Sequence, residues 1–202
     1  MKAIWLAMVI IGLSAPVSAG AVARPTAPVA DNPEMKALFA DDQRVRQPGY
    51  KGGWKDEPRR LRVRELLAKD ALKTAMDFEK AAFIFQHGDT PDDFLLAHTL
   101  AIVAVAKGRP TALWIASATL DRYLQHIGQK QIYGTQYQIL DRQGRPGLDG
   151  HWSQEPYDRN LISDTLRHDI GMPSQAEQRV QFEKYQRYFN DVQDRMKAQA
   201  AK

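Results

Sequence analysis

The sequence predicts an all-α protein of stacked antiparallel helical hairpins, with a small β-hairpin and a long C-terminal helix. The first observation is that helix start signals and glycines alternate through residues 58–128 with short connections, which makes neighbouring helices antiparallel. The second is a change of period after residue 128, where polar and apolar residues alternate as in a strand. The third is an apolar stripe at helical spacing in residues 174–199.

The composition indicates one helical domain, which we assign to residues 33–202. The chain has 202 residues, and its 28 basic and 24 acidic side chains give a formal charge of +4. This length can bury a sizeable core, and the charge is too small to predict a nucleic-acid partner. The absence of cysteine excludes disulfides, thiolate metal sites, iron–sulfur clusters and a lipid-modified N-terminal cysteine. No cofactor is expected.

The N-terminus has the organisation of a secretory signal peptide. Lys2 precedes an apolar run over residues 4–13, and the small residues that follow favour cleavage after Ala19, with Ala23 as the alternative. An apolar run of this length spans about 15 Å as a helix, half of a bilayer core, so no membrane span is expected after cleavage. We predict a periplasmic protein. The predicted segments are a signal peptide over 1–19 and a disordered leader over 20–32.

The first two helices are predicted from capping residues. Asn32 followed by Pro33 predicts the start of a short helix that ends near residue 46. Residues 47–55 contain prolines and glycines and form a loop. We expect Asp56 to cap the next helix, which ends near residue 69.

Three further helices have clear local signals. Thr74 and Asp77 form a variant of the capping box, and the helix that they open ends at Gly88, for which we expect a left-handed conformation. Thr90, followed by Pro-Asp-Asp, opens the next helix. The remaining boundaries are two terminating glycines and one opening proline: Gly108, Gly128 and Pro110.

The spacing of these signals is close to that of tetratricopeptide-type repeats. Pro58 and Pro91 are 33 residues apart, and Thr74 and Arg109 are 35 residues apart. The specific residues of that repeat are mostly absent, and two pairs are too few to stand alone. The pattern therefore indicates stacked hairpins over residues 58–128 rather than a true repeat.

Residues 129–157 are predicted to form a motif loop and a β-hairpin. Apolar and polar side chains alternate over residues 136–139, and residues 141–150 are rich in turn residues. A return strand and a short helix are expected over residues 152–157 and 160–169.

A capping box of Ser174 and Glu177 opens the C-terminal helix, predicted over residues 174–199. Its apolar stripe consists of Phe182, Tyr185, Phe189, Val192 and Met196. We expect this stripe to dock on the helical hairpins of a monomer, since two heptads are few for a dimeric coiled coil.

Three short motifs carry most of the polar chemistry: Gln86-His87-Gly-Asp89, Asp121-Arg122 and Gln131-Ile-Tyr133-Gly-Thr135-Gln136. They resemble the motifs Gln-His-x-Asp, Asp-Arg and Gln-x-Tyr-Gly-Thr-Gln of a secreted bacterial family of domains of unknown function. The resemblance covers residues 35–173 and extends to Asp42-Gln43-x-x-Arg46, with Gly88 where many members have alanine. It implies a shared fold and carries no activity.

The motifs predict one polar site at an edge of the bundle, because the two helices that carry them end on the same side. The expected ligand-binding residues are Gln86, Asp121, Arg122, Gln131, Tyr133, Thr135 and Gln136. An arginine, a carboxylate and several amides can hold a polar or anionic ligand. We therefore predict a binding or scaffold module whose partner is a small polar molecule or an envelope protein.

Two alternatives stay open. Asp121 and Arg122 can instead bond the backbone of the 133–136 turn, which makes the cluster a structural polar network. A hydrolase-like enzyme is the other alternative, with His87 at a helix C-terminus and Asp89 or Glu79 beside it for general-base catalysis.

Other chemistries lack their sequence patterns. The five histidines are not spaced for zinc, no aspartates follow a calcium loop, and neither a nucleophile elbow nor a glycine-rich phosphate loop occurs, so no metal is expected. His98, on an apolar helix, is expected to be a core residue with its hydrogen bonds satisfied. The arginines of residues 59–64 are expected to form a solvated helix face.

Overall fold

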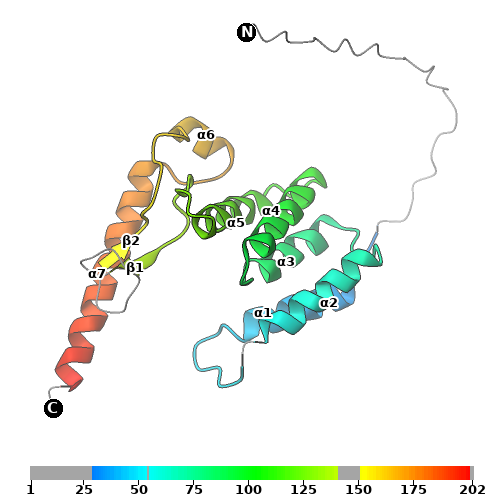
Figure 1. Cartoon of the computed structure of the whole chain (residues 1–202), viewed down its shortest axis with the longest axis horizontal. Helices are drawn as coiled ribbons and strands as arrows, with labels where there is room; N and C mark the ends of the chain where they lie inside the picture. Colours follow the sequence, from blue (N-terminus) through cyan, green and yellow to red (C-terminus); the bar gives the residue numbers. More distant parts are fainter. Residues whose placement is uncertain (1–28, 54, 141–150, 201–202) are drawn as a thin grey trace, which may run out of the picture.

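The computed structural model of the chain describes residues 29–53, 55–140 and 151–200. These ranges contain seven helices and one two-stranded antiparallel sheet, which confirms the predicted all-α class (Figure 1). The elements are α1 (Pro33–Arg44), α2 (Asp56–Ala68), α3 (Ala75–Phe85), α4 (Pro91–Ala106), α5 (Ala112–His126), β1 (Gln138–Leu140), β2 (His151–Ser153), α6 (Asp164–Asp169) and α7 (Gln175–Ala200). The predicted signal peptide, residues 20–28 of the predicted leader and the predicted turn over 141–150 lie outside the described residues.

Several helices start where their local signals predict. The side chain of Asn32 accepts a hydrogen bond at 2.9 Å from an amide in the first turn of α1, and Thr90 accepts one from the Asp93 amide at 3.2 Å. Thr74 and Asp77 form a complete capping box at the start of α3. Each bond satisfies an amide that has no partner inside its helix, which is why local sequence predicts these starts. The caps of α1 and α3 are also bonded to each other, because the Asn32 amide donates to Asp77 at 2.8 Å.

Two boundary predictions are wrong. The residue before α2 has a left-handed φ and makes no side-chain cap, whereas Asp56 lies inside the helix and pairs with Arg46 and Arg59 at 2.7 Å each. Gly88 does not have the expected positive φ. A Cβ at Gly88 would lie 2.2 Å from the Cβ of Asp93, so glycine is needed there for the close approach of the turn to α4.

The hydrophobic core lies among α1–α5, and its buried cluster falls entirely between Met35 and Ala116. Helix α4 contributes Ala97, Ala101 and Ala104, all completely buried. These small side chains allow α4 to lie close to both α3 and α5, with which it makes its most extensive contacts. Helix α2 packs on α3 less extensively, so the two predicted hairpins are not equivalent units.

The chain after α5 forms a smaller lobe around the hairpin. β1 pairs with β2 so that Ile139 lies opposite Trp152, and both strands are shorter than predicted. Gln131 forms an isolated parallel bridge with Tyr157, which fastens the motif loop, residues 131–136, to the segment after β2. Helix α6 is also shorter than predicted and is capped by Ser163.

Helix α7 lies along the β-hairpin (Figure 1). Phe182 stacks with Tyr137 at 6.3 Å between ring centroids, and Phe189 meets Trp152 edge-on at 6.0 Å. Met196, further along the helix, is 61% exposed. The apolar stripe therefore docks on the β-hairpin and not, as predicted, on the helical hairpins.

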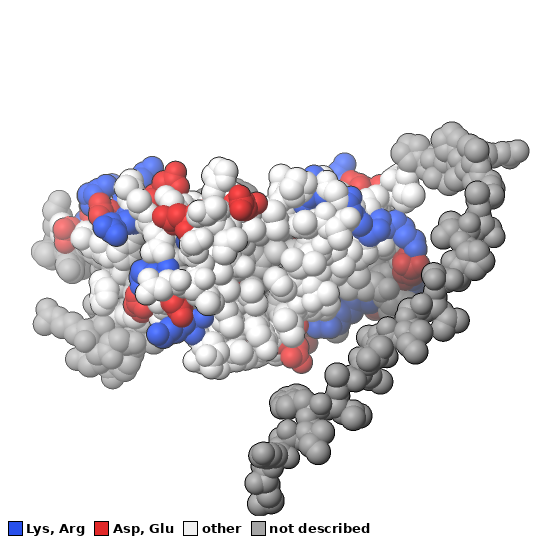
Figure 2. Space-filling view, turned by 90° about the horizontal axis from the view of Figure 1, so that it is seen from above, with Lys and Arg blue, Asp and Glu red and all other residues white. Residues whose placement is uncertain are grey.

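Charge is unevenly distributed over the surface. Figure 2 shows most charged side chains of one face toward its two ends, with mostly uncharged side chains between them. Residues 94–106 of α4 contain no Lys, Arg, Asp or Glu. Within the described ranges, no helix is both apolar enough and long enough to cross a bilayer.

Candidate functional site

Asp121, in the last turns of α5, is fully buried and organises the motif loop. Its Oδ1 accepts hydrogen bonds from the amides of Ile132 at 2.7 Å and Tyr133 at 2.9 Å. Its Oδ2 accepts from the amide and the hydroxyl of Thr135 at 2.9 and 2.8 Å. Since both oxygens are doubly paired, Asp121 is a structural residue, as the alternative of a polar network predicts.

Gln131 is the second structural residue of the loop and is also fully buried. Its Oε1 accepts from the Gln136 amide, and its Nε2 donates to the Gln136 carbonyl, both at 2.9 Å. The carbonyl of Tyr133 accepts from Arg167 at 2.7 Å and from Gln178 at 2.6 Å. These bonds replace the ladder partners that an irregular segment lacks. Burial raises the pKa of the Tyr133 hydroxyl above its ordinary value.

Arg122 joins the two halves of the motif set. Its Nε donates to Oε1 of Gln136 at 3.0 Å, and its Nη1 donates to the carbonyl of Gln86, just past α3, at 2.5 Å. The Nε2 of Gln136 donates to the carbonyl of Ala118 at 3.1 Å and to the hydroxyl of Thr135 at 3.0 Å. The ends of α3 and α5 therefore meet at one edge of the bundle, as their alternating directions predict.

A cleft of about 470 Å³ lies at this junction. Four of the predicted ligand-binding residues line it: Gln86, Arg122, Thr135 and Gln136. The other three belong to the scaffold of the loop: Asp121, Gln131 and Tyr133. The predicted set thus divides into residues that hold the loop and residues that face a cleft.

Arg122 is the charged residue of this cleft, and every other described residue that lines it is uncharged. Within the described ranges, Arg122 makes no ion pair and its Nη2 donates no hydrogen bond, and the side-chain amide of Gln86 makes none either. Burial lowers the pKa of the Arg122 guanidinium, because desolvation disfavours its charge. A partly desolvated cation without a carboxylate partner favours binding of an anion.

His87 has a different partner from those predicted. Its Nδ1 lies 3.3 Å from Oδ1 of Asp42, a residue of α1 that is only 1% exposed. The same carboxylate oxygen accepts a hydrogen bond from Arg46 at 2.9 Å. His87 does not line the cleft. Asp42 and Arg46 are four residues apart, about one helical turn, and this spacing could have predicted their pairing from the sequence.

The predicted partners of His87 lie in other contacts. Glu79 pairs with Arg109 and accepts a hydrogen bond from Thr111 at 3.1 Å, next to the start of α5. Asp89 pairs with Arg60 of α2. Within the part of the chain that the structure describes, no hydrogen bond or ion pair joins either carboxylate to His87, so the geometry predicted for general-base catalysis is not assembled.

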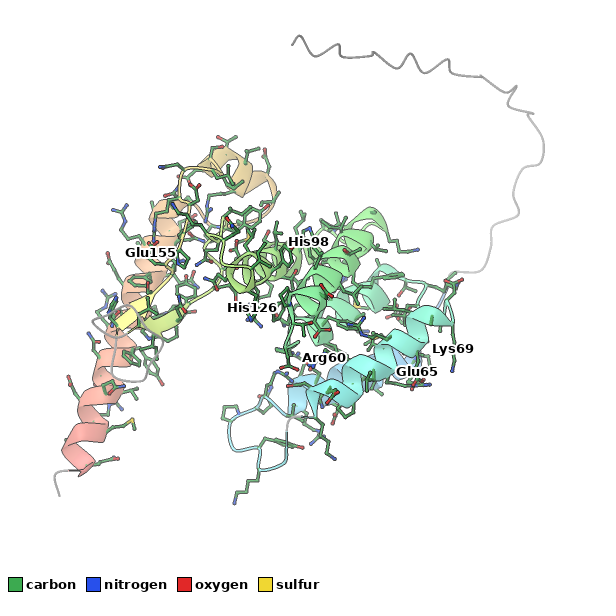
Figure 3. The ribbon with its side chains drawn as sticks, in the orientation of Figure 1. Arg60, Glu65, Lys69, His98, His126 and Glu155 are labelled. Atoms are coloured by element: carbon green, nitrogen blue, oxygen red, sulfur yellow. The ribbon has the colours of Figure 1, made fainter. Side chains whose placement is uncertain are left out.

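The arginines of α2 do not all form the predicted solvated face. Arg59 and Arg60 are only 4% and 6% exposed. Arg60 projects from α2 toward the bundle and donates to the carbonyl of His87 at 2.6 Å (Figure 3). Arg64, about half exposed, pairs with Asp93 at 2.7 Å. These pairs fasten α2 to the turn between α3 and α4 and to the first turn of α4, and they were not predicted from the sequence.

The histidines labelled on α4 and α5 in Figure 3 have structural contacts. His98 Nδ1 lies 2.9 Å from the carbonyl of Ala116, in agreement with its predicted satisfied state. His126 packs on the ring of Phe94 with 4.4 Å between centroids. Among the described residues, no group of three His, Asp or Glu side chains is arranged to hold a metal ion.

Aromatic residues of the cleft were not predicted from the sequence. They come from α5, the β-hairpin and α7: Trp114, Tyr137, Trp152 and Tyr185. The alternation around Tyr137 and the stripe that contains Tyr185 identified apolar faces. Neither pattern indicates that the two faces border the same cleft, since this depends on how the lobes pack.

Comparisons of the chain with protein-family models, curated proteins and solved structures find no match. The resemblance to a bacterial family of domains of unknown function therefore stays a prediction based on the motif residues. Functional inference for this chain depends on its own geometry.

Proposed function

We propose that the protein is a periplasmic binding module that holds a small polar ligand with an anionic group in the cleft at Arg122. The observation that carries this proposal is the unpaired state of the two polar groups at the junction, Arg122 Nη2 and the Gln86 amide, among the described residues. Both residues are part-exposed, and a ligand with a carboxylate or phosphate oxygen can bond Arg122 Nη2 in place of water.

The contrast with the scaffold residues supports a ligand site over a purely structural network. Asp121 and Gln131 are saturated with hydrogen bonds to the loop, so nothing remains for a ligand to bond. Arg122, which lines the cleft, is held in position by its Nε and Nη1 bonds to Gln136 and Gln86. Such a group is held in place before the ligand arrives, which reduces the entropy lost on binding.

The periplasmic location is part of the proposal and derives from the N-terminal sequence. Lys2, the apolar run over residues 4–13 and the small residues up to Ala19 have the order of a cleaved signal peptide. An exported binding module meets solutes and envelope components. Anionic molecules among them suit a cleft whose one charged residue, among those that the structure describes, is an arginine.

Thermal denaturation with a panel of acetate, succinate, phosphate, glutamate and glucuronate tests the binding function. A ligand that stabilises the fold by about 1 kcal/mol raises the melting temperature by about 2–4 °C in a chain of this size. Gln86→Ala should abolish this rise and leave the unliganded protein stable, because the Gln86 side chain makes no bond within the described residues. The matched control is Gln129→Ala, an exposed glutamine away from the cleft, which should keep the rise. A panel in which no compound gives a rise that depends on Gln86 contradicts the proposal.

A hydrolase is the second candidate, with Asp42 in place of the partners first expected. The pair of His87 and Asp42, at 3.3 Å, has the arrangement in which a buried carboxylate orients an imidazole. Hydrolysis of p-nitrophenyl acetate by the wild type and by His87→Gln tests it. Equal rates for the two proteins exclude His87 as a base for this ester.

A further inference from the structure

Aromatic side chains form much of the cleft that contains Arg122. Trp114 is 48% exposed and lies over Phe83, with 6.2 Å between the ring centroids and an angle of 19° between the planes. Tyr185 is 41% exposed and meets Tyr137 edge-on at 6.0 Å. Each ring is supported by another ring and still exposes part of its surface, so the cleft offers preformed flat apolar surfaces.

The polar groups of the cleft are mostly amides. Gln86 and Gln181 line it and, like any amide side chain, present a donor and an acceptor side by side. Hydroxyl groups both donate and accept hydrogen bonds, as amides do. A ligand rich in hydroxyls therefore suits a cleft lined by amides better than one lined by charged side chains. No carboxylate lines the cleft among the described residues, which disfavours a cationic ligand.

We infer that the ligand is an acidic oligosaccharide, with its sugar rings stacked on Trp114 and Tyr185 and one carboxylate paired with Arg122. This inference deepens the proposed function and depends on it. A pyranose ring has one face of C–H groups, which packs on an indole or phenol, and a rim of hydroxyls, which bonds amides. The volume of about 470 Å³ lies in the usual range for small-molecule sites, about 300–1,000 Å³.

The charge of the cleft favours a sugar carboxylate over a nucleotide, although a nucleobase also stacks on aromatic rings. A nucleotide phosphate carries up to two negative charges and is usually held by several donors or by a helix N-terminus. The described lining offers one guanidinium, Arg122, which matches a single carboxylate.

Titration calorimetry with three probes tests the ligand class: hexagalacturonate, its methyl ester and the neutral cellohexaose. Hexagalacturonate should bind, and its methyl ester should bind about tenfold more weakly, because esterification removes the charge that pairs with Arg122. Cellohexaose should bind no more tightly than the ester. Equal affinities for hexagalacturonate and its methyl ester would show that the ligand carboxylate does not contribute to binding and would overturn the inference.

Two aromatic variants and one control locate the binding. Tyr185→Ala and Trp114→Ala should each weaken hexagalacturonate binding about fivefold to tenfold through loss of stacking. Tyr188→Ala changes a neighbouring tyrosine of α7 that is 68% exposed and does not line the cleft, and should leave affinity within about twofold. If Trp114→Ala fails to fold, Tyr185→Ala alone decides the outcome. Equal losses for Tyr185→Ala and Tyr188→Ala overturn the inference.

The two proposals fail in different ways. If hexagalacturonate does not bind while another anion of the panel gives a rise in melting temperature that depends on Gln86, the oligosaccharide is wrong and the binding function stands. If no probe in either experiment depends on a residue of the cleft, both proposals are wrong.

Discussion

At the scale of single residues, Asp121 has the largest structural role in the motif loop, because both of its oxygens accept hydrogen bonds from Ile132, Tyr133 and Thr135. Asp121→Ala leaves these buried donors unpaired and should lower the free energy of unfolding by about 3 kcal/mol or more. Urea denaturation measures the change. Asp194→Ala, an exposed aspartate of α7, is the control and should stay within about 0.5 kcal/mol. A small loss for Asp121→Ala would contradict its structural role.

Gly134 and Gly128 form a matched pair for a second prediction. Both have a positive φ, of 72° and 73°, but a Cβ at Gly134 would lie 2.7 Å from the ring of Tyr157, whereas nothing lies within 4 Å of one at Gly128. Gly128→Ala should cost about 1–2 kcal/mol for the left-handed backbone alone. Gly134→Ala should cost more by at least about 1 kcal/mol, because it adds a clash with the ring. Equal melting temperatures for the two variants would show that the ring moves aside without cost.

The sequence located the polar residues of the site but could not assign their roles. The spacing of Gln86, Arg122 and Gln136 predicted that they meet, and they do. Whether a side chain faces the cleft or the loop depends on its direction in the folded chain, which spacing does not give. The same limit applies to Glu79, which was predicted to lie beside His87. Two helical turns, about 10 Å, separate it from the end of α3, and it pairs with Arg109 instead.

At the scale of elements, the junction of α2 with its neighbours should be sensitive to acid. Desolvation raises the pKa of Asp56, but hydrogen bonds from Arg46 and Arg59 outweigh it, so the net shift is downward. The pKa of Asp93 is lowered in the same way. Desolvation raises it, but hydrogen bonds from the Asp89 amide, the Arg64 side chain and others outweigh that effect. A lowered pKa in the folded state contributes stability above the unfolded value, about pH 4, and this stability is lost as the pH falls through the folded value.

Urea denaturation at pH 7 and pH 3 checks this acid sensitivity. The wild type should lose stability between the two, and Asp56→Asn should lose less because it has no proton to take up at this site. Asp194→Asn, at an exposed position, should follow the wild type. An Asp56→Asn variant with the full wild-type loss would contradict the role of this carboxylate.

The C-terminal helix gives a further prediction at this scale. Phe189 is half-buried against Trp152, so Phe189→Ala should cost about 1–2 kcal/mol, less than the 3–5 kcal/mol of a fully buried phenylalanine. Tyr188→Ala, on the exposed side of α7, should change stability by less than about 0.5 kcal/mol. Equal effects in chemical denaturation would show that the stripe is not docked.

Elements that depend on local bonds were predictable, and those that depend on distant partners were not. The starts of α1, α3 and α4 follow from Asn32, Thr74 and Thr90, whose capping bonds stay within one helical turn. The environment of Asp56 depends on Arg46, across a loop, and the need for Gly88 depends on Asp93. The docking of α7 depends on the β-hairpin, whose aromatic face is not evident from so short a strand pattern.

At the scale of the whole molecule, we predict export with cleavage after Ala19. The apolar run over residues 4–13 is too short to remain as an anchor. Amino-terminal sequencing of the exported protein should begin at Gly20, and fractionation should recover the protein in the periplasm. A chain that begins at Met1, or that stays with the membrane after a salt wash, would contradict this prediction.

The position of the hydrophobic core along the chain has a consequence for the order of unfolding. The buried cluster ends at Ala116, and the chain after residue 130 is joined to α5 by hydrogen bonds of Ala118, Asp121 and Arg122. Residues 131–200 can therefore open as a unit while α1–α5 stay folded, and in native-state hydrogen exchange their amides should exchange before those of α3 and α4. The cleft spans both parts, from Gln86 to Tyr185, so a bound ligand should slow exchange in the later part and leave the exchange of α3 and α4 unchanged.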